Sequence, residues 1–378
     1  MTLLDNAFAQ LGAMPGDNRR ALNEKADEAA MLSGADTEGA LNQLMQMNRR
    51  ISAELAWLPG ATAEAADAFL AYARTVSQGE AAPIPPVLEL GTALAQANAL
   101  APLFEIWPTD SPELIIGLCR ALDGIIGQIT TNDTLQAINE DRTKGGWEPI
   151  SDEFSLAGLL NDHLRELCVP VRRSVEKILS DAAASDTLQK ILESGEVDSQ
   201  GVVAEAACDA YRMRVHEKAE KLKAEIDAAT KELQEATSLR FWSVEDLQEK
   251  VKRWCSLTAP LRQIPGAERN DAKGIGNGLM NVAVNYFNHA GTVEKKKNVY
   301  VPIPNGMRTV TITYKSQTDA IGNVRKVTEW MKQAFHEQLE LQNRIKESDA
   351  TLKNMQTNEE LMLSRAEADA YAGRGIRR

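Results

Sequence analysis

The sequence has few of the residues from which catalytic and metal sites are usually built. Its 378 residues include only four histidines and four cysteines. No nucleophile motif or paired-carboxylate signature accompanies them. His163, with Asp162 and Glu166 nearby, has no second histidine one helical turn away, and a metal needs three or more converging ligands. We therefore predict no enzyme activity, no cofactor and no metal site, and we expect His163 to lie on the surface.

The four cysteines lie far apart, and no Cys-x-x-Cys pair occurs among them. They are Cys119, Cys168, Cys208 and Cys255. Such spacing fits neither a disulfide framework nor a zinc site. Isolated cysteines behave as small hydrophobic residues. We expect reduced, half-buried thiols in a cytoplasmic protein.

Long hydrophobic runs are also missing. The longest, Leu114 to Ile129, is interrupted by Arg120 and Asp123, whereas a membrane-spanning helix needs about 20 apolar residues. The first residues, MTLLDNAFAQLG, carry an acidic residue and no basic region, unlike a secretory signal. These features predict a cytoplasmic protein that does not enter a membrane.

Aromatic residues make up only 5% of the chain, and its formal net charge is −12. Phosphate binding needs clustered Lys and Arg, so this balance argues against a nucleic-acid partner. Alanine, leucine, glutamate and glutamine are abundant. These residues lose little side-chain freedom in a helix, so the composition predicts a mainly α fold.

Residues 1–78 predict a module of helices. The spacing of apolar residues indicates helices over Asn6–Leu11, Asp17–Leu32 and Thr62–Ser77, and a helix from Thr37 that continues, or restarts, until Pro59. Glycine, proline and aspartate occupy the segments between these helices, as is usual at helix ends.

Two phrases in this module carry a family resemblance. Residues 6–12 spell NAFAQLG, and residues 49–60 spell RRISAELAWLPG. With a short helix followed by two longer ones, they resemble bacterial proteins that have a J-domain-like module, related to the DnaJ-type co-chaperones. The resemblance is confined to the N-terminal module. It implies a J-like helical fold there and docking on a DnaK-type chaperone.

The partner-binding residues that this resemblance implies are Arg49, Arg50, Glu54, Trp57 and Asp36. J-domains stimulate the chaperone ATPase through a His-Pro-Asp tripeptide between the second and third helices. Here residues 33–36 spell SGAD, and only Asp36 could stand in. We therefore expect docking without the usual ATPase stimulation. The same side chains also fit a structural role, because arginines often lie near helix ends and tryptophans in cores.

A proline-rich linker is predicted over residues 79–87, and a helical middle domain over residues 88–200. Within this domain the pattern predicts helices over Leu88–Leu100, Pro112–Ile129, Ser155–Cys168, Val171–Ala182 and Asp186–Leu192. Thr131 to Pro149 is polar and contains a Lys-Gly-Gly stretch, so we expect no helix there.

Residues 201–370 predict a region of long, coiled-coil-like helices. Apolar residues alternate by four and three along Val202–Ala236 and again along Asp319–Ala370. An antiparallel pairing of these two helices within the chain is our first interpretation, and a homodimeric coiled coil is the second. Either arrangement would also offer helices to other protein partners.

One small β-hairpin is predicted near residues 298–314, around Asn305-Gly306, preceded by Lys295-Lys296-Lys297. Because Pro302 and Pro304 remove hydrogen-bond donors, we expect a loop longer than two residues. Upstream, a helix fits Val244–Cys255, and the glycine run Gly274–Gly278 predicts a flexible turn before a helix over Leu279–Phe287. A basic tail fills residues 371–378.

The sequence is compatible with two functions. The resemblance favours a chaperone-associated interaction protein or adaptor, docking a DnaK-type chaperone or a multi-protein assembly. The alternative is a structural coiled-coil scaffold or assembly subunit with no chaperone link, in which the helices alone would make the contacts.

Overall fold

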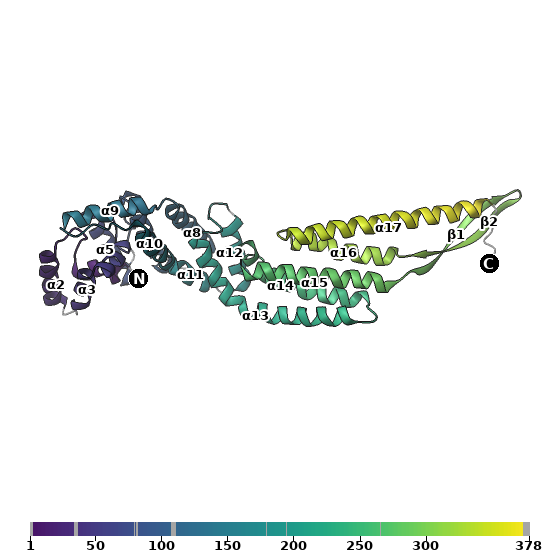
Figure 1. Ribbon diagram of the computed structural model, residues 1–378, viewed down its shortest axis with the longest axis horizontal. Coiled ribbons are helices and arrows are strands. Elements are labelled where there is room, and N and C mark those ends of the chain that lie inside the picture. The colour runs from purple at the N-terminus through teal and green to yellow at the C-terminus, as the bar shows by residue number, and fades with distance from the viewer. Residues whose placement is uncertain are drawn as a thin grey trace. The chain divides into compact units, whose positions relative to one another are not determined.

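The fold is mainly α-helical, as predicted, with one two-stranded antiparallel sheet among the described residues (Figure 1). A computed structural model describes residues 3–33, 37–78, 80, 82–106, 111–178, 180–193, 195–264 and 266–372. The chain divides into two compact units, Met1–Arg214 (unit 1) and Val215–Arg378 (unit 2).

Unit 1 is built from short helices. Their bounds are η1 Leu3–Asp5, α1 Ala7–Leu11, α2 Arg19–Ser33, α3 Glu38–Met45, α4 Met47–Leu55, α5 Ala63–Ser77, η2 Val87–Glu89, α6 Ala93–Leu100, α7 Leu103–Ile106, α8 Pro112–Ile126, α9 Thr131–Lys144, α10 Glu153–Leu167, α11 Val169–Glu176 and α12 Asp181–Glu193. Helix α13, Val202–Glu235, begins in unit 1 and ends in unit 2. The helix predicted to continue or restart before Pro59 restarts, because the extended backbone of Gln46 separates α3 from α4.

Residues on both sides of the predicted linker 79–87 share one core. Phe8, Trp57 and Phe69 pack in the same buried cluster as Leu90 and Ala95. Side chains of α6 also bond to the end of α4 and the loop after it, as described below. The predicted boundary between residues 1–78 and 88–200 therefore lies inside unit 1, and the chain divides at residue 214 instead of near 200.

The prediction of a non-helical segment over Thr131–Pro149 is wrong, because residues 131–144 form α9. Thr130 caps this helix: its side-chain oxygen accepts the Asp133 amide, and its hydroxyl donates to the Asp133 carboxylate. This is a variant of the capping box. One side of α9 is buried and includes Ile138 and Arg142. The Gly-Gly pair ends the helix without preventing it.

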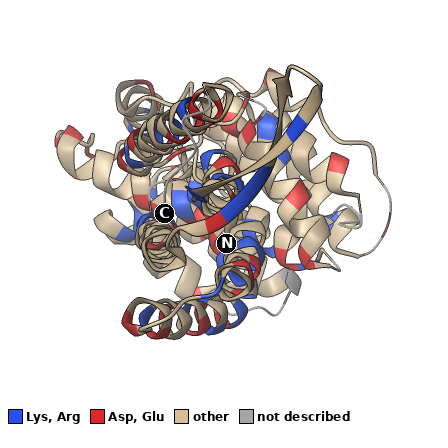
Figure 2. Ribbon diagram, turned by 90° about the vertical axis from the view of Figure 1, so that its right-hand side faces the viewer, with Lys and Arg blue, Asp and Glu red and all other residues tan. Residues whose placement is uncertain are grey.

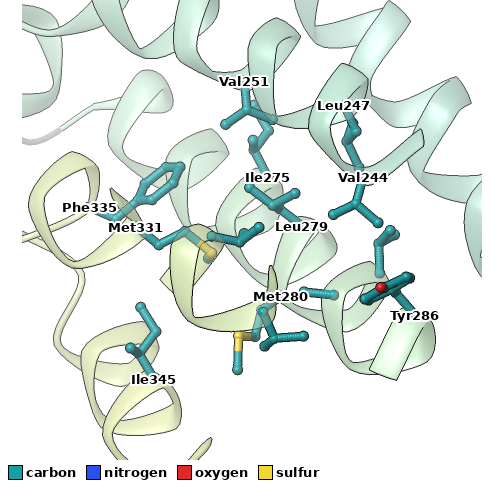
Figure 3. Close-up of a cluster of buried hydrophobic side chains, with 14 of the residues drawn as sticks. Val244, Leu247, Val251, Ile275, Leu279, Met280, Tyr286, Met331, Phe335 and Ile345 are labelled. Atoms are coloured by element: carbon teal, nitrogen blue, oxygen red, sulfur yellow. The ribbon is translucent and has the colours of Figure 1, made fainter. Parts of the chain in front are cut away.

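Unit 2 is a helical bundle with a β-hairpin. After α13 come α14 Phe241–Thr258, η3 Leu261–Gln263, α15 Ala267–Ala290, β1 Val293–Ile303, β2 Gly306–Ser316, α16 Thr318–Ala334 and α17 Leu339–Tyr371. Apolar side chains from α14, α15, α16 and α17 point toward one another in its core, among them Val251, Leu279, Met331 and Ile345 (Figure 3). This burial is the main stabilising contribution to the bundle.

The glycine run does not form the predicted flexible turn, because α15 passes through it without a break. A Cβ atom on Gly276 would overlap Leu341 of α17, and one on Gly278 would lie 3.0 Å from Thr230 Cγ2 of α13. Both long helices therefore pack closely on α15. The glycines provide close helix–helix approach, and Gly274 has open space around it.

The helix predicted over Asp319–Ala370 is interrupted between Ala334 and Leu339, and its two parts, α16 and α17, pack on each other. The predicted antiparallel pairing with the helix over Val202–Ala236 is wrong, because α17 packs mainly on α15, α16 and the hairpin among the described elements. Arg262 Nη1 donates to the last α16 carbonyl, Ala334 O, at 2.7 Å. Gln342 Nε2 donates to Phe335 O at 2.9 Å. These side chains satisfy carbonyls that a continuous helix would satisfy with its own backbone.

The hairpin confirms the predicted β signal, but its loop has only two residues, since Ile303 pairs with Gly306. In a hairpin with a two-residue loop, the closing pair is hydrogen-bonded and the next pair is not. Pro302, opposite Met307, occupies this second pair, where a residue needs no amide donor. The expectation of a longer loop is therefore wrong.

All four cysteines are free thiols in the interior. Burial raises the pKa of Cys168 and of Cys255 to about 12, so both remain protonated near neutral pH. Among the described residues, no single helix is long and apolar enough to cross a membrane. Only α8 and α9 taken together, across a 78° bend, reach the required length and composition.

Candidate functional site

Two of the side chains picked out by the resemblance, Arg50 and Glu54, form a buried cluster in unit 1 together with Arg142. Arg50 Nε donates to Glu54 Oε1 at 2.7 Å, one turn further along α4. Arg142 Nε of α9 donates to Glu54 Oε2 at 2.8 Å. Each of these three residues is exposed to 2% or less. They form a closed triad in which one carboxylate lies between two guanidinium groups.

The Arg50 guanidinium also joins other segments of unit 1. It donates to Pro15 O at 2.7 Å, in the loop before α2. Its Cζ lies 3.8 Å from the ring centroid of Trp147, after α9, which is cation–π geometry. Arg50 thus connects the loop before α2, helix α4 and the segment after α9.

Burial raises the pKa of the Glu54 carboxyl and lowers that of Arg50, while the neighbouring opposite charges oppose both shifts. Removing a charged group from water costs several kcal/mol, which only good hydrogen-bond geometry offsets. The triad therefore favours the folded state only when all three members are present.

The two resembling phrases are in direct contact. The rings of Phe8 and Trp57 lie 5.6 Å apart between centroids, and Trp57 is fully buried. Asn6 caps α1 through the Phe8 amide and donates to Ala53 O of α4 at 2.8 Å. These residues thus specify how α1 packs against α4.

The five predicted partner-binding residues have different environments. Arg50, Glu54 and Trp57 lie in the interior, where a docking protein cannot reach their side chains. Arg49 is exposed on α4, and Asp36 lies outside the described residues. Neither Arg142 nor Trp147 is among the predicted site residues, because no helix was expected in the segment Thr131–Pro149. The Thr130–Asp133 cap was the signal that could have located them.

The prediction that His163 lies on the surface is wrong. It is half-buried on α10, and its Nε2 lies 2.8 Å from Asn98 Oδ1 of α6. Asn98 Nδ2 donates to Leu55 O and Trp57 O at 2.7 and 2.5 Å. The histidine therefore connects to the end of α4 through one buried amide.

The exposed apolar residues of unit 2 include a group on the hairpin. The inward side of the sheet, with Val299, Val301 and Ile312, packs on Leu363 and Ala366 of α17. Figure 1 shows the last part of α17 alongside the hairpin. We call β1, β2 and residues 355–371 of α17 the hairpin arm. Helix α17 supports the arm along one face.

Polar contacts fix the hairpin to α17 as well. Lys297 Nζ lies 2.6 Å from Glu367 Oε1. At the start of α16, the Gln317 amide and the Thr318 hydroxyl donate to the Glu359 carboxylate at 3.0 and 2.7 Å. In these contacts two α17 carboxylates accept two hydrogen bonds and form one ion pair, so the sheet has a defined position on its helix.

The outward side of the hairpin is uncovered in unit 2. Tyr300 is 60% exposed and Met307 is 65% exposed. Lys296 lies on the same outward side as Tyr300, whereas Lys295 and Lys297 pair with Asp319 and Glu367. The blue stretch on the hairpin in Figure 2 is this lysine run.

Within the described part of the chain, no group of three or more His, Cys, Asp or Glu side chains is placed to hold a metal ion.

Comparison of the chain with protein-family models, curated proteins and solved structures finds no match.

Proposed function

We propose that this protein is an interaction protein, an adaptor or scaffold subunit, whose partner binds the outward side of the hairpin arm. The observation that carries the proposal is a supported sheet face with exposed large apolar side chains. Exposed apolar groups that cluster on one surface favour protein–protein contact. Tyrosine and methionine are also among the residues enriched at interfaces.

The support from α17 matters for this function. An isolated two-stranded hairpin is marginally stable in water, but here one face is buried against Leu363 and Ala366 and tied down by Glu359 and Glu367. The arm is thus ordered before binding, so a partner does not have to pay for ordering it. Both strands also have an open edge among the described residues, to which an extended segment can add.

Charge indicates the chemistry of the partner. Lys296 adds an ammonium group to the apolar surface around Tyr300, and the outward side also carries a row of threonines on β2, Thr309, Thr311 and Thr313. A protein segment that combines apolar side chains with carboxylates would match this surface. Opposite charges at an interface chiefly increase the association rate and the specificity.

The double variant Tyr300→Ser/Met307→Ser should lower recovery of the stoichiometric partner about tenfold or more, because central apolar anchors dominate interface free energy. The measurement is affinity capture with the tagged full-length protein, followed by titration with the purified partner. Leu339→Ser is the matched control, since Leu339 is an exposed apolar residue of α17 outside the arm. Undiminished binding by the double variant, or no stoichiometric partner at all, would contradict the proposal.

Docking on a DnaK-type chaperone is a second candidate. It rests on the resemblance of residues 6–12 and 49–60 and on one structural observation, the exposure of Arg49 beside the buried Arg50. This surface lies in unit 1, so it can operate independently of the hairpin arm.

Arg49→Glu is expected to reduce chaperone recovery at least several-fold while the fold is retained, because an exposed charge is replaced by its opposite. Surface plasmon resonance with a purified DnaK-type chaperone measures this, with Arg20→Glu on α2 as the control for overall charge. Equal binding by the wild-type protein and Arg49→Glu, or equal loss in both variants, would argue against this candidate.

A further inference from the structure

Two adjoining cavities in unit 1 have no role in the functions proposed above. One, of about 360 Å³, has His163, Glu166 and Arg173 among its lining residues. The other, of about 330 Å³, is lined mainly by apolar residues such as Phe69 and Tyr72 of α5. Leu3, Asn98, Pro102 and Glu105 line both cavities. Small-molecule sites usually have this size and combine apolar walls with a few placed polar groups.

The hydrogen bonds of Asn98 fix which imidazole nitrogen carries the proton. Its Nδ2 donates to two backbone carbonyls, so its Oδ1 faces His163 and must accept a hydrogen bond. Nε2 is therefore the protonated nitrogen of the ring. Burial lowers the pKa of His163 to about 4, so the ring is neutral near pH 7. Nδ1 then has a lone pair and, among the described residues, no hydrogen-bond partner.

The charges around the first cavity favour a positive ligand. Glu105 pairs with Arg173, and Asp5 has an interaction of its own, so Glu166 is the carboxylate in the described lining that can act on a ligand. Glu166 is exposed on α10 and forms no ion pair with another described residue. An anion beside Glu166 would be repelled by its carboxylate. A bare metal ion would not find three converging ligands there.

We propose that the two cavities together bind a small organic amine. Its ammonium group lies in the first cavity, where it donates to His163 Nδ1 and to Glu166, and its apolar part lies in the second cavity near Phe69 and Tyr72. Asn98, which links His163 to the end of α4, is a positioning residue because it sets the tautomer. The site is separate from the hairpin arm and would give unit 1 a ligand of its own.

Calorimetric titration of the full-length protein tests this proposal with a pair of probes. Phenethylamine should bind saturably, at one molecule per chain and with a Kd of about 1 mM or lower, as expected for a ligand of this size. Its carboxylate counterpart, 3-phenylpropionate, has the same ring and the opposite charge, and it should show no saturable binding.

Substitutions of lining residues test whether phenethylamine binds in these two cavities. Glu166→Gln and His163→Phe should each weaken phenethylamine binding about tenfold, because the first removes the negative charge beside the ammonium group and the second removes the accepting nitrogen. Asp162→Asn is the matched control: it removes a carboxylate from the same helix but outside the described lining, and it should bind as the wild type does. Because Glu166 is exposed, its substitution should leave the circular dichroism spectrum unchanged.

Three outcomes would overturn the proposal: no saturable binding of the amine, equal binding of the carboxylate probe, or undiminished binding by both Glu166→Gln and His163→Phe. A loss of the same size in Asp162→Asn would also overturn it, since that would indicate attraction to the overall negative charge instead of a site.

Discussion

Arg50→Ala is expected to destabilise unit 1 by about 3–5 kcal/mol, which is the usual effect of removing one member of a buried ion pair. Arg50 donates to Glu54 and to Pro15 O and stacks on Trp147. Its loss leaves these groups buried without their partner. Urea unfolding, followed by circular dichroism, measures the change in the free energy of unfolding.

The neighbouring arginine supplies a matched control. Arg49→Ala removes the same side chain from an exposed position, so its effect should stay within about 0.5 kcal/mol. Arg50→Lys should recover only part of the lost stability, because an ammonium group cannot reproduce the planar set of donors or the stacking. Similar unfolding curves for Arg49→Ala and Arg50→Ala would contradict the structural role of the triad.

This difference also determines how chaperone docking must be tested. A variant that changes both arginines would lose binding through unfolding, whether or not the surface around Arg49 contacts the chaperone. Only Arg49 can be changed while the interior of unit 1 stays intact, so loss of binding in an Arg49 variant can be attributed to the surface.

Gly276→Ala is expected to destabilise unit 2 by about 1–3 kcal/mol, the usual effect of overfilling a packed interior. The added Cβ would overlap Leu341 Cδ2, and Leu341 is fully buried, so it cannot move without displacing its neighbours. Alanine favours a helix by up to about 1 kcal/mol over glycine. The overlap is expected to outweigh this gain. Thermal unfolding of the full-length protein measures the result.

Helix α15 also contains a glycine, Gly274, at which substitution by alanine is expected to stabilise the protein. Gly274 is exposed, and a Cβ atom there would meet no other atom within 4 Å. Gly274→Ala should therefore stabilise α15 by about 0.5–1 kcal/mol. In the double variant Gly276→Ala/Leu341→Ala, the smaller side chain leaves room for the new methyl group, so the two effects should not add. A stabilising Gly276→Ala would show that α15 and α17 are not in close contact.

Local sequence predicted most of the helices and the hairpin. The four–three spacing located α13 within one residue of its observed end, and Asn305-Gly306 located the turn between the strands. These features depend on residues that are near one another in the chain: apolar periodicity, capping side chains and turn chemistry. The sequence also identified the two phrases that pack together through Phe8 and Trp57.

Contacts between distant residues decided the rest. Glu54 and Arg142 are 88 positions apart, so neither helix alone reveals that a carboxylate and two arginines share one buried site. The break between α16 and α17 has no glycine or proline. Arg262, far away in the sequence, satisfies the carbonyl at that helix end.

The glycine run in α15 illustrates the physical reason. A glycine has the same local preference whether its missing side chain leaves room for a flexible turn or for a neighbouring helix. Only the tertiary structure shows which atoms occupy that space: Leu341 beside Gly276, Thr230 beside Gly278, and none beside Gly274. The sequence by itself determined where most of the helices and the two strands form, because those choices are mainly local. Packing between distant segments determined which side chains are buried, which remain exposed for partners, and where cavities form.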